Sequence, residues 1–139
     1  MMVLLPPDEQ RDGKILSESE AVARLGVVAR ALRVHLAGAA TLRCADGVRT
    51  VGFVFDRDGK QILRMPKITP DFLIGFSDSI ASTGSAAQFP VADTPFGRLG
   101  MLVGEDILYG THVRATFFAG AEILLNPAIE VSNDALDTR

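Results

Sequence analysis

The sequence of 139 residues has a single cysteine, Cys44, and only two histidines, His35 and His112. One thiol excludes an internal disulfide framework and a thiolate-rich zinc site. Neither histidine has a second histidine or cysteine at ligand spacing, so we expect no metal and no cofactor. Cys44 lies beside the turn signal Ala45-Asp46-Gly47, and we expect it to be an unreactive bystander and not a reactive thiol.

Long apolar runs and dense basic runs are also missing. The longest apolar stretches are too short to span a bilayer. The net charge is −3 and no Lys/Arg cluster occurs, which argues against nucleic acid and membrane surfaces as partners. Residues 1–7 have no basic segment and end in Pro-Pro, unlike a secretion signal. These absences predict a cytoplasmic protein.

The length predicts one domain, residues 1–139, with a polar tail at 132–139. Its first half has one helical pattern followed by strand patterns. Ser17 and Glu20 have capping-box spacing, and apolar residues then recur every three to four positions as far as Leu32, which predicts an amphipathic helix. The further expected elements are a strand end at 3–5, strands at 36–43, 50–55 and 62–65 with a hairpin turn at 58–59, and a long loop at 69–87.

The second half has a strand–helix–strand pattern. The run at 98–103, which is apolar after Arg98, is typical of a strand buried on both faces. A helix is predicted at 111–119, closed by Gly120. A second strand is predicted at 121–125, apolar except for Glu122, and it stops at Asn126-Pro127. This order implies a parallel pair with a right-handed crossover, and hence an α/β fold. The glycines at 97, 100 and 104 do not form a phosphate loop, because no Lys-Ser/Thr follows them.

Three segments together resemble the nitrilase (carbon–nitrogen hydrolase) superfamily. They are the hairpin 54–67, which ends in Arg-Met-Pro-Lys, the strand Asp93–Val103, and Arg114 with the segment Ala119–Pro127. The resemblance covers residues 3 to about 128. It implies part of an αββα sandwich, in which mixed sheets are flanked by helices.

The resemblance also implies a cysteine nucleophile, a glutamate base and a lysine that stabilises the oxyanion. Lys67 matches the lysine, as a vestigial oxyanion-stabilising group or merely as a charge at a strand end. The nucleophile position is Gly104, and the glutamate position is Pro7. Asp8 or Glu9 restores a carboxylate only if the alignment slips by one or two residues.

Glu105 and Asp106 are the remaining candidates beside the nucleophile position. They are either an acid/base or metal-binding pair or polar residues that end a buried strand. Adjacent carboxylates in a strand point to opposite faces, which favours the second interpretation. Asp106 matches an acidic position of the family, which favours a structural hydrogen-bonding role. Gly110-Thr111 replaces the Pro-Glu that the family carries before this helix.

The missing nucleophile and base predict a catalytically inactive homologue, an oligomerising scaffold or a binding or regulatory subunit. One alternative is a hydrolase of small amides or nitriles that activates water with Glu105, Asp106 or Glu9. Another is a truncated fragment of such an enzyme. Family domains have further elements on both sides, so we expect a second copy or a partner subunit to cover exposed sheet edges. The expected ligand is a small amide, nitrile or carboxylate.

Overall fold

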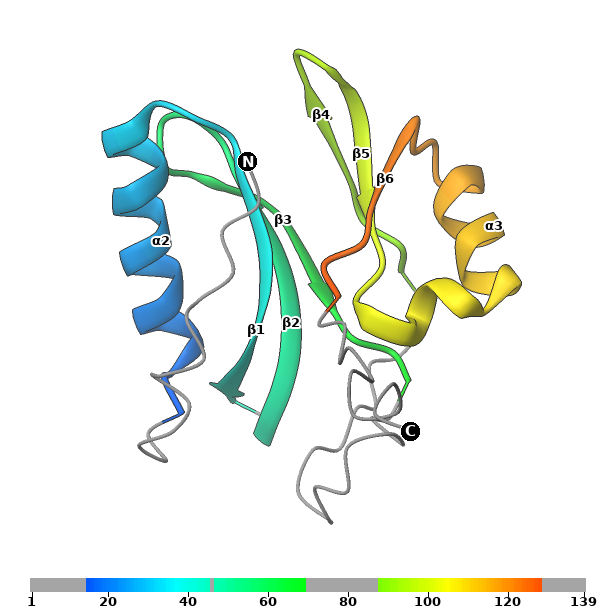
Figure 1. The fold of residues 1–139 in the computed structure, drawn as a ribbon, viewed down its shortest axis with the longest axis horizontal. Coiled ribbons are helices and arrows are strands. Elements are labelled where there is room, and N and C mark those ends of the chain that lie inside the picture. Colours follow the sequence, from blue (N-terminus) through cyan, green and yellow to red (C-terminus); the bar gives the residue numbers. More distant parts are fainter. Residues whose placement is uncertain (1–14, 46, 70–87, 129–139) are drawn as a thin grey trace, which may run out of the picture.

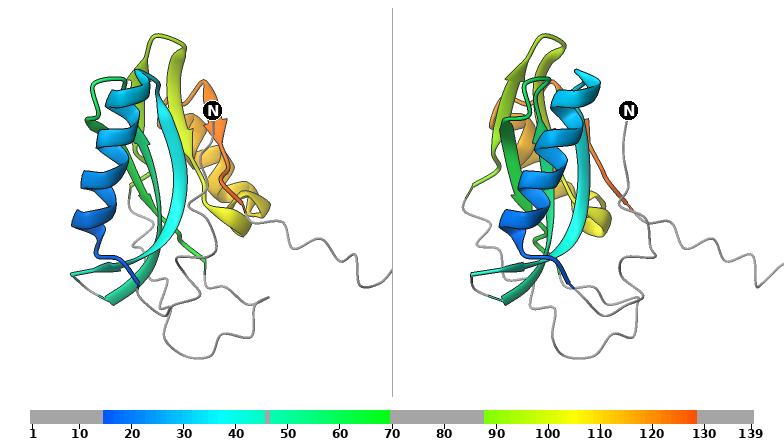
Figure 2. Two further views of the ribbon diagram at one scale, coloured as in Figure 1. Left: turned by 60° about the vertical axis from the view of Figure 1, so that its left-hand side comes forward. Right: turned by 90° about the vertical axis from the view of Figure 1, so that its left-hand side faces the viewer.

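The computed structural model describes residues 15–45, 47–69 and 88–128, which form four layers (Figure 1). One helix covers the outer face of a first sheet, a second sheet lies on the other side of that sheet, and another helix covers the second sheet. The same order is visible in Figure 2. The elements are α2 (Glu18–Leu32), β1 (Leu36–Cys44), β2 (Gly47–Phe55), β3 (Gln61–Pro66), β4 (Val91–Thr94), β5 (Gly97–Met101), the 3₁₀ helix η1 (Gly104–Leu108), α3 (Gly110–Phe118) and β6 (Ile123–Leu125). The predicted strand at 3–5, most of the predicted loop and the tail lie outside the described residues.

Helix α2 begins at the predicted capping box. The Ser17 hydroxyl accepts a hydrogen bond from the Glu20 amide at 3.3 Å, and the Glu20 carboxylate accepts one from the Ser17 amide at 3.1 Å. The helix ends at Arg33, whose φ of 54° is left-handed. Its buried residues Ala21, Leu25, Gly26 and Ala29 recur at helical spacing on one face, so the predicted amphipathic helix is confirmed.

The first sheet is an antiparallel meander in the order β1-β2-β3. The hairpin between β2 and β3 is held by the Asp56 carboxylate, which accepts hydrogen bonds from the Asp58 and Lys60 amides, both at 2.9 Å. These bonds, the Lys60 bond first, lower the pKa of Asp56. Gly59 has a φ of 81°, as a tight turn requires, and packs against Gly26 of α2. A Cβ on Gly26 would lie 2.7 Å from the Gly59 carbonyl oxygen.

The second sheet has the order β4-β5-β6, and α3 connects the parallel strands β5 and β6. The predicted parallel pair is therefore confirmed. The sequence does not predict strand β4, because its four residues are too few to show the alternation of a strand. Gly100 lets α3 approach β5, since a Cβ there would collide with the Thr116 side chain of α3. Neither helix in the described ranges is long and apolar enough to cross a membrane.

Alternate residues of β2 belong to two different cores. Phe53 and Phe55 pack with α2, whereas Val54 belongs to the core between the two sheets. That second core also contains Leu63, Met65, Ala92, Leu99, Met101, Leu102 and Val103. The side-chain period of two along a strand produces this division. The predicted α/β class and the αββα layer order are both confirmed.

Candidate functional site at the end of strand β5

The chain turns sharply at Gly104, where the buried run of β5 passes into η1. Gly104 has a φ of 57°, in the left-handed region. Its amide donates to the Pro127 carbonyl at 3.0 Å, and its carbonyl accepts from Asn126 Nδ2 at 3.0 Å. Asn126 Nδ2 also donates to the Leu102 carbonyl at 2.8 Å. A left-handed residue between strand and helix presents its side chain outwards, and here the side chain is absent.

Lys67 reaches this turn from the other sheet. Its amide donates to the Thr50 carbonyl at 2.8 Å, which fixes the backbone just beyond β3. Its side chain is 3% exposed, and Nζ lies 2.7 Å from Oε2 of Glu105. A Cβ on Gly104 would lie 3.3 Å from the Lys67 Cε. The structure thus brings together three residues that the sequence singles out.

The Lys67–Glu105 pair is unevenly buried. The Lys67 ammonium is inside the protein, whereas the Glu105 side chain is 33% exposed. A buried charge needs a counter-charge, and removing one partner of such a pair is strongly destabilising. Glu105 therefore neutralises Lys67 while part of its side chain remains in water.

Asp106 directly follows Glu105 in the sequence, but its surroundings are different. It is fully buried, and its Oδ1 accepts from the Thr69 amide at 2.8 Å and the Thr69 hydroxyl at 2.5 Å. Its Oδ2 accepts from the Ile68 amide at 2.8 Å. Asp106 thus ties η1 to the segment that follows Lys67, which is a structural role.

The expectation that these two carboxylates end a strand is wrong, because Glu105 and Asp106 both lie in η1. Adjacent side chains on a 3₁₀ helix diverge by about 120°, with three residues per turn. The two carboxylates still have separate partners, because the helical geometry of η1 points them in different directions. Strand alternation is not the cause. No group of three potential metal ligands occurs within the described ranges.

The two histidines both contact aromatic rings. His112 lies in α3, with its ring centroid 5.3 Å from Tyr109 and 5.9 Å from Phe89, and its Nδ1 is 3.3 Å from the Asp106 carbonyl oxygen. His35 precedes β1 and packs edge-on against Phe96, with centroids 4.9 Å apart.

Cys44 is half-buried at the end of β1 and has a basic neighbour from another strand. Arg64 Nη2 lies 4.0 Å from its Sγ. Arg64 also pairs with Glu18, whose hydrogen bond raises the pKa of the guanidinium. The sequence does not reveal this contact, because Arg64 comes from another strand.

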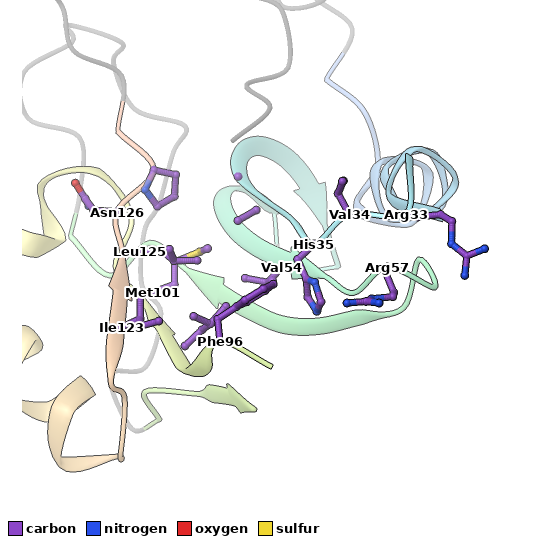
Figure 3. A pocket seen from close by; sticks show the side chains of 14 residues that line it. Arg33, Val34, His35, Val54, Arg57, Phe96, Met101, Ile123, Leu125 and Asn126 are labelled. Atoms are coloured by element: carbon purple, nitrogen blue, oxygen red, sulfur yellow. The ribbon is translucent and has the colours of Figure 1, made fainter. Parts of the chain in front are cut away.

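A cleft of about 620 Å³ between the sheets is not visible in the sequence at all (Figure 3). Asn126 and Pro127 line it and also hold the Gly104 backbone, so one end of the cleft adjoins the turn. Its apolar wall includes Val54, Met101, Ile123 and Leu125, and its basic rim includes His35 and Arg57. Pro7, Asp8 and Glu9 lie outside the described residues.

The family model for carbon–nitrogen hydrolases matches residues 5–137, nearly the whole chain. Together with the four-layer sandwich and the lysine at the strand-to-helix turn, this match shows that the chain belongs to the carbon–nitrogen hydrolase family. No curated protein matches the sequence significantly.

Solved structures of nitrilase-type proteins have a similar fold. The carbon–nitrogen hydrolase from Helicobacter pylori G27 superposes with a TM-score of 0.66 at 26% identity, over 79% of this chain and 37% of its own. Nit3 from Saccharomyces cerevisiae gives 0.67 at 19% identity, over 85% and 43%. A cysteine-to-alanine mutant of the amidase from Nesterenkonia sp. AN1, in complex with butyramide, gives 0.67 at 18% identity, over 84% and 45%. This chain therefore spans less than half the length of each of these structures.

Proposed function

We propose that this chain is a non-catalytic member of the carbon–nitrogen hydrolase family, which binds a small amide, nitrile or carboxylate beside Lys67 and acts as a binding or regulatory subunit. The observation that carries the proposal is Gly104, a residue without a side chain at the turn that faces Lys67. Covalent catalysis needs a nucleophilic side chain, and glycine cannot supply one.

Two structures of the Nesterenkonia amidase support this proposal. One is described as showing acrylamide added at the active-site cysteine of that enzyme. Another is the cysteine-to-alanine mutant, which holds butyramide. A protein of this fold thus retains a small amide after a cysteine has been replaced by a residue that cannot attack it.

The test is ammonia release from butyramide and butyronitrile by the purified chain, compared with Lys67→Ala. We expect no release that depends on Lys67. The exposed Lys60→Ala is the matched control for loss of a lysine charge. Turnover that disappears in Lys67→Ala and persists in Lys60→Ala would contradict the proposal.

A second candidate function is hydrolysis by activated water, with Glu105 as the base. The distance of 2.7 Å between Glu105 and Lys67 favours Glu105 over Asp106, whose oxygens already accept three hydrogen bonds. However, a carboxylate beside a positive charge is a weaker base. Loss of turnover in Glu105→Gln would distinguish this mechanism from a trace of contaminating enzyme.

We further propose that a second copy of the chain covers the cleft between the sheets. The cleft has an apolar wall in which Ile123 is 37% exposed, and burial of apolar surface between two copies is favourable. Size exclusion with light scattering should give a dimer, and Ile123→Asp in the cleft wall should give a monomer. A monomeric wild-type chain would contradict the proposal. The cytoplasmic location stays a prediction, as does the alternative of a fragment.

A further inference from the structure

The cleft between the two sheets has an apolar wall that could hold the chain of a ligand. Its volume of about 620 Å³ is that of an ordinary small-molecule site. The strands that line it are β1, β2, β5 and β6, and the wall includes Val54, Met101 and Leu125. Strands β3 and β4 contribute none of the lining, so the cleft lies toward the edge strands β1 and β6.

The rim of this cleft is basic. His35 and Arg57 lie there, and Figure 3 shows the Arg57 side chain extending toward His35, whereas Arg33 extends away from the cleft. None of the described residues that line the cleft is acidic. Within the described ranges, the Arg57 side chain has no ion-pair or hydrogen-bond partner. Because arginine keeps its proton, the rim carries a positive charge without a direct partner.

Asp56 is close to this rim but does not cancel its charge. It interacts electrostatically with His35. Its carboxylate, however, accepts hydrogen bonds from the amides of the hairpin, and it is not among the residues that line the cleft. The anion that would complement the rim must therefore come from outside these residues.

We propose that the cleft binds a monocarboxylate with an aliphatic chain of medium length. Its carboxylate lies at Arg57 and His35, and its chain lies against the apolar wall. A planar carboxylate suits a guanidinium, because the two groups can form a pair of parallel hydrogen bonds. The inference goes beyond the binding proposed beside Lys67, because Lys67 does not line this cleft.

The second copy that we propose to cover the cleft adds one consequence, and here the inference rests on the proposed function. Enclosing an arginine without a counter-charge is costly. The bound carboxylate supplies that counter-charge, so octanoate should raise the share of dimer measured by light scattering. Dissociation of the dimer by octanoate would show that ligand and second copy compete for the cleft, and would overturn this arrangement.

The test is titration of the chain with sodium octanoate and with sodium butyrate at constant ionic strength, followed by the backbone amide signals of Val54 and Ile123. Octanoate should bind at least roughly tenfold more tightly than butyrate, because each further methylene that leaves water tightens binding up to roughly fourfold. Octylammonium, which has the same chain length and a positive head, should not bind.

Arg57→Gln should weaken octanoate binding roughly fivefold, the upper range for an exposed ion pair. Because Arg57 is exposed, the fold should tolerate this change. Arg114→Gln is the matched control. Arg114 is also exposed, but it lies in α3 against the Phe118 ring and does not line the cleft. This control should bind octanoate as the wild type does.

Equal binding of octanoate and butyrate would overturn the inference, as would octylammonium binding as tight as that of octanoate. Equal effects of Arg57→Gln and Arg114→Gln would also overturn it. A wild-type chain that stays monomeric would refute the second copy alone, and the titration would still decide on the ligand. Ammonia release that depends on Lys67 would refute the proposed non-catalytic role without affecting the result at the cleft.

Discussion

The two helices of the sandwich cover their sheets very differently. Helix α2 has a complete capping box and buries four residues, three of which, Ala21, Leu25 and Ala29, belong to a core with β1 and β2. Helix α3 has no side-chain cap, and Thr116 is its single buried residue. Its Phe117 and Phe118 are 48% and 82% exposed.

The α2 side of the fold contributes most to its stability, and the α3 side carries residues of the candidate site. The α2 side is held by apolar burial and by the glycine contact between α2 and the β2–β3 hairpin. The α3 side follows the turn at Gly104, and its η1 helix supplies Glu105 and Asp106. Exposed aromatic side chains add little to the stability of a single chain, since burial is what stabilises them. Substitutions on the two sides should therefore have unequal effects.

The largest effect should come from Phe55→Ala in the α2 core. Phe55 is fully buried, and removal of its ring should lower the free energy of unfolding by about 3–5 kcal/mol. Urea denaturation at fixed protein concentration measures the change. If the free energy of unfolding falls only as much as it does when an exposed phenylalanine ring is removed, apolar burial on the α2 side does not stabilise the fold as proposed.

Asp106→Asn should have the next largest effect. One of its carboxylate oxygens becomes an NH₂ group, which then faces the Ile68 or Thr69 amide as a second donor. We expect a loss of roughly 1.5–3 kcal/mol, the range for hydrogen bonds to charged groups. The exposed Asp93→Asn provides the control in the same denaturation series, and equal losses for both variants would contradict the structural role of Asp106.

Ser17→Ala should cost about 1 kcal/mol, the usual value for an N-cap. It removes the hydroxyl that accepts from the Glu20 amide. Circular dichroism during denaturation follows this helix loss, and Ser17→Thr, which keeps a hydroxyl acceptor at the N-cap, is the matched control. No difference between the two variants would show that the capping box does not support α2.

The smallest effect should come from Phe118→Ser on α3. The ring is 82% exposed, so the free energy of unfolding should change by no more than about 0.5 kcal/mol. The dimer proposed to form through the cleft should also survive, which size exclusion can test. A large loss of stability or a shift to monomer would place Phe118 in an interface and weaken the contrast between the helices.

Parts of the site could be predicted from the sequence because they depend on local order. Lys67 follows the hairpin strand, and Gly104 follows the apolar run, so both positions can be located from motifs alone. The role of Asn126 was missed, although an Asn-Pro pair directly after a strand was its available signal. The contact between Arg64 and Cys44 and the cleft between the sheets left no such signal, since each joins segments far apart in the chain.

The sequence by itself determined the two α-helices, the strands apart from β4 and the parallel connection through α3, because periodicity, caps and turn residues act over a few positions. It also determined that the turn carries no nucleophile. Only the tertiary structure decided that Glu105 pairs with Lys67 while Asp106 binds the Ile68 and Thr69 amides. Adjacent carboxylates are chemically alike, and the direction in which η1 points each of them decides which partner it meets.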